Sequence, residues 1–243
     1  LKTALISAPE NTSLIVNYAD SLYSVQKLER AVTYYKRALC LMPNEIRAQA
    51  NIAESLAELQ RSDEALVYID AAISRNPRSQ KLRLNKAFTL LLLKKYREGW
   101  QAYESRLNQE IDEAPKRLLS IPRWKHEVLK DKTILVCSEQ GVGDEILFSA
   151  YVTKLSNMAK HVIIETDPRL VPLVSRSFKH LEVYPYSRRI SGTQPIYNYH
   201  WLKKCKIYPD LFVDLASLPY FLKETHQKLL STTPHLKGDI NVT

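Results

Sequence analysis

The strongest constraint on the fold of this chain is a repeat of 34 residues across its first hundred positions. Proline recurs at Pro9, Pro43 and Pro77, and leucine recurs at Leu22, Leu56 and Leu90. Small residues recur at the same interval in the series Ala4, Ala38 and Ala72, the series Ala19, Ala53 and Ala87, and the series Ala31, Ala65 and Gly99. A fixed period of about 20 to 50 residues is typical of a solenoid built from stacked repeats.

The residue types at these positions predict paired helices. Each proline ends one helix and opens the next turn, because it lacks an N–H donor and its ring clashes with the preceding turn. Small side chains at Ala19 and Ala31 let two antiparallel helices approach closely, and Leu22 and Tyr35 fill the remaining space. We expect helices over residues 12–24, 28–41, 46–59, 62–75, 80–94 and 96–109, with residues 1–8 ending an earlier pair.

This pattern resembles the tetratricopeptide repeat (TPR) family over residues 1–107. The third unit departs from the motif, with Arg106 where alanine is expected and Ile111 where proline is expected. TPR arrays bind peptides or partner proteins on a concave face made by the first helix of each pair, so the resemblance implies such a partner. Asn17, Asn51 and Asn85 are candidate partner-binding residues on that face. The alternative is that these asparagines tie adjacent helices together or face water.

Beyond Glu113 the helical period stops and the pattern changes. Apolar, β-rich runs over 133–137, 161–165 and 181–184 alternate with helical runs over 144–158 and 168–178. Such alternation predicts a parallel sheet with helices on both faces. The loops after the strands then share one edge, where ligands bind in such folds. We expect an all-α domain at 1–112, a linker at 113–130 and an α/β domain at 131–243.

The loop after the first strand is the most informative segment of the second half. It reads Ser138-Glu139-Gln140-Gly141-Val142-Gly143-Asp144-Glu145. Its glycines permit a tight turn and close approach of another molecule, and a helix N-terminus follows. Ile146 stands where a dinucleotide fingerprint needs a third glycine, and no Gly-Lys-Ser/Thr follows. The loop is therefore neither that fingerprint nor a P-loop.

The loop also resembles a known family. Residues 139–144, with Phe148 and Tyr151, are similar to the loop of TPR-linked proteins related to the family 9 glycosyltransferases, which include lipopolysaccharide heptosyltransferases. Other strings agree with those bacterial proteins in order and content: Gly99-Trp100, Tyr103-Glu104, Arg106, Pro122, Trp124 and Asp214-Leu215-Ala216-Ser217-Leu218-Pro219. The resemblance covers residues 99–219.

The resemblance implies the first, Rossmann-like half of a GT-B type enzyme, which binds a sugar, lipid or protein acceptor. Asp144 would be the catalytic base that takes the proton of an acceptor hydroxyl. Glu139 and Gln140 would contact the acceptor, and Gly141 and Gly143 would let it approach. Asp144 also stands where the N-cap of the following helix belongs, and capping and catalysis are not exclusive. Glu139 and Gln140 could instead anchor the loop. The nucleotide-sugar donor is expected in a further C-terminal domain, with no cofactor or metal in this chain.

Composition bears on the other functional classes. The net charge of +9 is spread evenly, with 18 basic against 14 acidic residues up to position 120 and 17 against 12 beyond it, so no nucleic-acid surface is expected. The cysteines form no CxxC pair, which fits a reducing cytoplasm, and no apolar run suits a transmembrane segment. Tyr197, Tyr199 and Tyr208 could stack on a sugar, although core packing is their default role. The alternative function is a noncatalytic TPR scaffold for protein–protein interaction.

Overall fold

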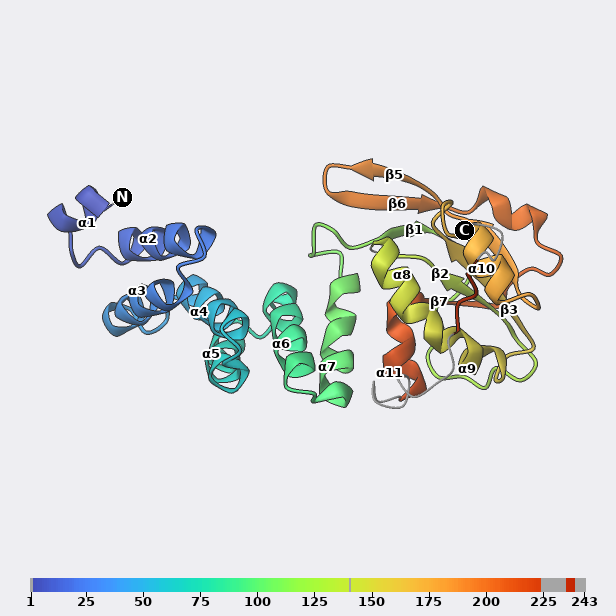
Figure 1. Cartoon of the computed structure of the whole chain (residues 1–243), viewed down its shortest axis with the longest axis horizontal. Helices are drawn as coiled ribbons and strands as arrows, with labels where there is room; N and C mark the ends of the chain where they lie inside the picture. The colour runs from blue at the N-terminus through green and yellow to red at the C-terminus, as the bar shows by residue number, and fades with distance from the viewer. Residues whose placement is uncertain (1, 140, 224–234, 239–243) are drawn as a thin grey trace. The chain divides into compact units, whose positions relative to one another are not determined.

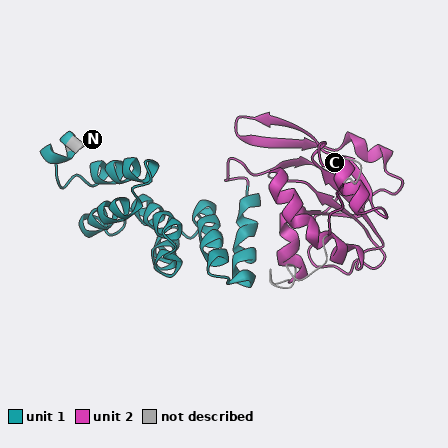
Figure 2. Ribbon diagram, in the orientation of Figure 1, with its two compact units in different colours: residues 1–108 teal, residues 109–243 magenta. Residues whose placement is uncertain are grey.

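The computed structural model describes residues 2–139, 141–223 and 235–238 (Figure 1). The chain divides into two compact units, residues 1–108 and residues 109–243 (Figure 2). This division differs from the linker expected at 113–130, because that segment belongs to unit 2 and holds the strand β1 (Lys116–Leu118). Among the described residues, no helix is both long and apolar enough to cross a membrane.

Unit 1 is a TPR-like chain of helix pairs that follows the short helix α1 (Lys2–Ser7). The pairs are α2 (Thr12–Ser24) with α3 (Leu28–Leu41), α4 (Ile46–Glu58) with α5 (Ser62–Arg75), and α6 (Gln80–Leu92) with α7 (Tyr96–Tyr103). The predicted helices are confirmed at their starting residues. The last one is shorter than expected, because α7 gives way to a 3₁₀ turn at Glu104–Leu107.

Buried small residues let the helices of each pair approach closely, as the repeat predicts. Ala19, Ala31, Ala65 and Ala87 have no exposed surface. In the third pair, a Cβ added to Gly99 would lie only 2.9 Å from Cγ of Leu91. A larger side chain there would push α7 away from α6.

The turn inside each pair has a second repeated feature that the residue types did not reveal. Gln26, Gln60 and Lys94 adopt left-handed backbone conformations, with φ of 58°, 63° and 59°. Around Gln60, the N–H of Arg61 donates to the carbonyl of Leu56 at 2.8 Å, and the N–H of Gln60 donates to Ala57 at 3.0 Å. This is the Schellman pattern that ends helices, and glycine is its preferred central residue.

Gln60→Gly is therefore expected to stabilise unit 1 by about 0.5–1 kcal/mol, because it removes the strain of a left-handed side chain. Urea unfolding followed by circular dichroism would measure the change. The control is Val67→Gly, at an exposed position inside α5, which is expected to destabilise by about 0.5–1 kcal/mol. Equal loss of stability in both variants would contradict the prediction.

Unit 2 contains a parallel sheet in the strand order β4-β3-β2-β7 among its described residues. The strands are β2 (Thr133–Cys137), β3 (His161–Thr166), β4 (Glu182–Pro185) and β7 (Leu211–Asp214), and each neighbouring pair is parallel. The three predicted strands are confirmed to within a residue or so. The strands of this sheet are rich in apolar residues because both faces of the sheet are covered. β2 is buried along its whole length.

The expectation of helices on both faces is wrong for one face. There Leu135, Cys137 and Ile163 pack against Tyr197 and Tyr199. Tyr197 belongs to a smaller sheet, in which β6 (Gln194–Asn198) pairs with β1 in parallel and with β5 (Ser187–Ser191) in antiparallel. A second sheet therefore covers a surface where a crossover helix was expected.

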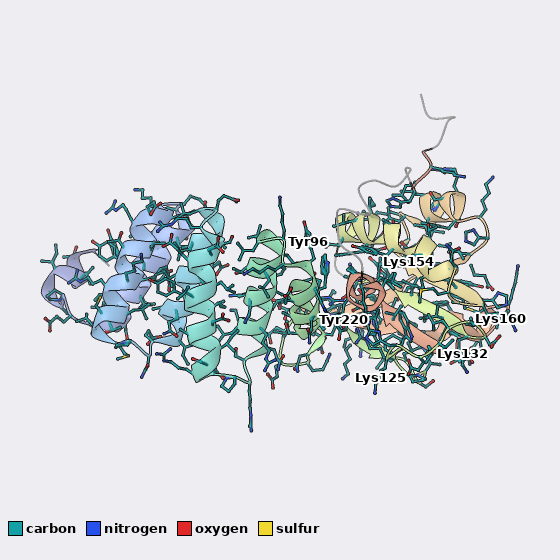
Figure 3. The ribbon with its side chains drawn as sticks, turned by 90° about the horizontal axis from the view of Figure 1, so that it is seen from below. Tyr96, Lys125, Lys132, Lys154, Lys160 and Tyr220 are labelled. Carbon is teal, nitrogen blue, oxygen red and sulfur yellow. The ribbon has the colours of Figure 1, made fainter. Side chains whose placement is uncertain are left out.

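The helices of unit 2 are short. They are α8 (Val142–Phe148), α9 (Val152–Ser156), α10 (Val171–Ser177) and α11 (Leu218–Leu222), with 3₁₀ turns at Ser149–Tyr151, His200–Lys204 and Leu215–Ser217. The single helix expected over 144–158 is thus α8 and α9 joined by a 3₁₀ turn. Figure 3 shows Lys154 on α9 beside α11, and the Lys154 ammonium donates to the carbonyl of Leu222 at 3.4 Å.

Candidate functional site

The loop singled out in the sequence lies at the point where the sheet reverses its strand order. The chain passes from β2 to β3 on one side, whereas β7 lies on the other side of β2. The carboxyl ends of β2 and β7 therefore lie at the edge where parallel α/β sheets commonly bind ligands. Ser138 and Glu139 follow β2, and Asp214 ends β7.

Glu139 joins the two loops at this edge. Its side chain is buried, and Oε1 accepts a hydrogen bond from the backbone N–H of Ala216 at 3.0 Å. The carboxylate thus holds the loop after β2 against the loop after β7, as the anchoring alternative predicts. Gln140 lies outside the described residues.

Asp144 occupies the third position of α8, because the helix begins two residues earlier than expected. Gly141 rather than Asp144 is the N-cap, and Oδ2 of Asp144 accepts from the backbone N–H of Gly141 at 3.3 Å. The carboxylate is only partly buried, and its hydrogen bond is longer than the common range for N–H···O. It therefore supports the helix start while staying near solvent.

Gly141 and Gly143 are both exposed, and neither has a positive φ. A Cβ at Gly143 would meet no atom within 4 Å, and a Cβ at Gly141 would meet only Asp144, at 3.8 Å. Neither backbone strain nor internal packing requires glycine here. What the glycines provide is open space beside the Asp144 carboxylate.

Beneath this edge lies a buried network of charges built on Arg117 of β1. Its Nε donates to Oδ1 of Asp214 at 2.8 Å, and its Nη2 donates to the carbonyl of Ser138 at 2.8 Å. Arg123 donates to the other carboxylate oxygen of Asp214 at 2.9 Å. Two arginines thus share Asp214, and their guanidinium groups fix the ends of β2 and β7.

Glu145 forms the other half of the buried network. Its Oε1 accepts from the Ser138 hydroxyl at 2.5 Å, and its Oε2 accepts from the Thr166 hydroxyl at 2.6 Å and the Asp167 N–H at 2.9 Å. Burial raises the pKa of Glu145, against the lowering effect of these donors. The residue ties α8 to the ends of β2 and β3 and is not available to a ligand.

Glu165 is fully buried in β3, and desolvation raises its pKa to about 8. Its Oε2 accepts from the Ser138 N–H at 3.2 Å, whereas the nearest Arg117 nitrogen is 3.6 Å away. Oε1 of Glu165 has no hydrogen-bond partner among the described residues. Because Arg117 is paired more closely with Asp214, its charge offsets only part of the effect of burial on the pKa of Glu165.

This raised pKa predicts that unit 2 loses stability as the pH rises. Between the unfolded pKa of about 4.5 and the folded pKa of about 8, unfolding releases the Glu165 proton, so the free energy of unfolding falls across that window and levels off above it. Glu145 acts in the same direction. Glu165→Gln is expected to remove much of the difference between the free energies of unfolding that urea titrations measure at about pH 5 and at about pH 8. The exposed control Glu113→Gln is expected to keep this difference, and an unchanged difference in Glu165→Gln would contradict the assignment.

In unit 1, two of the candidate partner-binding asparagines make contacts between repeats. Asn51 of α4 donates to Oδ1 of Asp20 on α2 at 2.7 Å, and Asn17 accepts from Arg47 at 3.0 Å. Asp20 also accepts from the hydroxyl of the buried Tyr35 at 2.6 Å and pairs with Arg47. These two asparagines therefore join neighbouring helices, the alternative left open by the sequence.

Asn85 differs from its two equivalents. Its backbone carbonyl accepts from Thr89 at 3.0 Å, and its side-chain amide has no hydrogen bond in the described part of the chain. Phe88 and Leu92 lie on the same face of α6, three and seven residues further on, and are 49% and 53% exposed. At the corresponding places α2 carries Asp20 and Ser24, and α4 carries polar residues.

Sequence reasoning missed Arg117, Glu165 and the role of Asp214 in the network. A glutamate inside the apolar run of β3 was the available signal, because a buried carboxylate needs donors nearby. Nothing local pairs Arg117 with Asp214, which follows 97 residues later. Among the described residues, no group of histidine, cysteine, aspartate and glutamate side chains is arranged to hold a metal ion.

Together these features describe a TPR-like helical array followed by an α/β unit with a parallel sheet. The chain is 33% identical over 97 residues to Protein FlbA of Caulobacter vibrioides, a match that covers 39% of this chain and 16% of that protein. It thus spans a small part of the length of this curated relative. No family model matches the chain.

Three solved structures are each similar to less than half of the chain. MamA from Desulfovibrio magneticus RS-1 is 17% identical, with a TM-score of 0.40 over 43% of this chain and 59% of that one. Pseudomonas aeruginosa PilF is 23% identical, with a TM-score of 0.39 over 43% of this chain and 48% of that one. The first TPR domain of human RPAP3 is 18% identical, with a TM-score of 0.39 over 41% of this chain and 79% of that one.

Proposed function

We propose that this chain is part of a TPR-bearing glycosyltransferase, in which the α/β unit is the Rossmann-like, acceptor-binding half of a GT-B type enzyme. The observation that carries the proposal is the position of the loop after β2. It lies at the reversal of strand order, with exposed glycines beside a carboxylate that is not fully buried. A second domain of a longer protein would hold the nucleotide-sugar donor.

Asp144 would act as the base of the transfer. Its carboxylate takes the proton of an acceptor hydroxyl while the hydroxyl oxygen attacks the anomeric carbon, and the bond from that carbon to the nucleoside diphosphate breaks. The hydrogen bond from the Gly141 N–H to Asp144 is long and therefore weak. Replacing it with a hydrogen bond from the acceptor hydroxyl would cost little free energy. Gly141 and Gly143 supply the room that the acceptor needs.

The experiment is a titration of the full-length protein with a panel of sugar nucleotides, followed by an assay for nucleoside diphosphate release. Saturable binding, together with release that depends on an added hydroxyl acceptor, supports the proposal. If no sugar nucleotide binds, the transferase assignment is lost.

A noncatalytic scaffold is the second candidate, and the internal bonding of the acidic residues favours it. Glu139 and Glu145 are bonded to backbone and hydroxyl groups of unit 2, and Asp144 accepts from the backbone N–H of Gly141 at the start of α8. On this hypothesis the loop serves packing, and the TPR-like array alone carries the function. The sugar-nucleotide titration separates the two, because a scaffold binds a partner protein and no donor.

The array would bind its protein or peptide partner on the face of α6 that carries Asn85, Phe88 and Leu92. This strip combines exposed apolar side chains with an amide that has no hydrogen bond in the described residues. An extended peptide could place an apolar residue on Phe88 and bond its backbone to Asn85. Hydrogen exchange of the protein, measured alone and in a purified complex with its partner, tests this. A partner that leaves the amides of α6 unprotected would exclude this face.

A further inference from the structure

A hollow of about 260 Å³ opens on the smaller sheet of unit 2. It lies at the carboxyl ends of β1 and β6, which meet at one edge because the two strands are parallel (Figure 1). Leu202 forms part of its apolar wall, and its polar lining comes from Ser120, Asn198, His200, Lys203 and Tyr208. None of these residues belongs to the loop that carries Asp144.

The hollow has a positive character. None of its lining residues is acidic, and Lys203 brings an ammonium group that has no hydrogen bond or ion pair within the described part of the chain. Lys204 and Lys206 follow close behind in the sequence. An anion at the hollow would therefore meet a cation that is not already neutralised.

The remaining side chains suit a small molecule with hydroxyl groups. Tyr208 is 56% exposed and lines the hollow, so its aromatic ring is available to a ligand there. Asn198 donates its amide to the Ser187 hydroxyl at 2.8 Å, which fixes the group and leaves its carbonyl oxygen as an acceptor. Ser120 adds a hydroxyl. An aromatic face with fixed polar groups around it is the arrangement that holds a sugar ring by stacking and hydrogen bonding.

We infer that this hollow binds a small anionic sugar, a monosaccharide that carries a carboxylate or a phosphate group. Lys203 pairs with the anionic group, Tyr208 stacks on the ring, and Asn198 accepts from a ring hydroxyl. The volume is slightly below the roughly 300–1,000 Å³ of sites for drug-sized ligands, which suits a single sugar unit. The inference stands without the transferase proposal, because the residues come from a different sheet.

The test is a titration of the whole chain followed by nuclear magnetic resonance of its backbone amides. The probes are glucuronate, glucose 6-phosphate, neutral glucose and acetate. We expect one or both anionic sugars to shift the amides of Ser120, Asn198 and Lys203 saturably, and the tighter of the two identifies the anionic group. Glucose, which lacks the charge, is expected to bind about tenfold more weakly, because it cannot form a charged hydrogen bond with Lys203. Acetate, which lacks the ring, is expected to leave these amides unshifted.

Lys203→Gln is expected to weaken the anionic sugar about tenfold, and Tyr208→Ala to weaken every sugar. Both residues are exposed, so the amide spectra of the variants should keep their dispersion. The matched control is Lys160→Gln, an exposed lysine of the same unit that does not line the hollow. Lys160 precedes the amino end of β3, and Figure 3 shows it near Lys132, which precedes the amino end of β2. Absence of saturable shifts, equal affinity for glucose and the anionic sugars, or unchanged affinity in Lys203→Gln would each overturn the inference.

Discussion

Asp144→Asn in the full-length protein is expected to lower sugar transfer by about 10²- to 10⁴-fold, the usual contribution of a general base. The asparagine side chain has nearly the same shape, and its carbonyl oxygen can still accept the N–H of Gly141. Its amide group cannot take a proton. Release of nucleoside diphosphate in the presence of acceptor measures the loss, and the free energy of unfolding of unit 2 is expected to change by less than about 1 kcal/mol.

Two further variants separate catalysis from helix capping. Asp144→Ala loses both the base and the acceptor of the Gly141 N–H at the start of α8, so it is expected to match Asp144→Asn in activity and to lose about 1 kcal/mol more stability. Asp131→Asn changes an exposed aspartate in the same unit and is expected to leave both quantities unchanged. Turnover within about threefold of the wild-type value in Asp144→Asn would remove the catalytic assignment, since a base contributes far more than that.

The array was predictable because one period of 34 residues sets the core and the turns together. Proline, alanine and leucine mark the period, and each has a steric reason for its place. The early end of α7 was not predictable from those residues. Arg106 is buried there with its guanidinium 4.5 Å from the centre of the Tyr103 ring, and it donates to the Tyr103 carbonyl at 3.1 Å. These contacts accompany the tighter 3₁₀ turn.

The second unit was predictable where strands are buried on both faces and therefore read as apolar runs. The β5–β6 hairpin was not predicted because β5 is exposed throughout and carries Arg188 and Arg189, so its sequence shows no apolar period. β1 was not predicted because it is very short. The structural role of Arg117 could not be predicted either, because its partner Asp214 is adjacent only in the folded sheet. The loop at residues 138–145 was located by its glycines, whereas the bonds of Glu139 and Glu145 depend on segments distant in sequence.

Arg117→Met is expected to destabilise unit 2 by about 3–5 kcal/mol, the usual effect of removing one partner from a buried ion pair. Asp214 would keep Arg123 but lose the bond of 2.8 Å to Arg117, and the carbonyl of Ser138 would lose its donor. Because the stability of a domain is about 5–15 kcal/mol, a substantial part of unit 2 could be unfolded in the variant. The fluorescence of Trp124 and Trp201, both in unit 2, would follow this transition in urea.

The matched control is Arg189→Met, which makes the same change on an exposed strand of the same unit and is expected to alter stability by less than about 0.5 kcal/mol. Unit 1 supplies an internal reference, because its helices contain none of these residues and should keep their unfolding midpoint. A loss below about 1 kcal/mol in Arg117→Met would mean that Arg123 alone satisfies Asp214. Such a result would show that the paired arginines are redundant, since a single guanidinium would then hold the ends of β2 and β7 together.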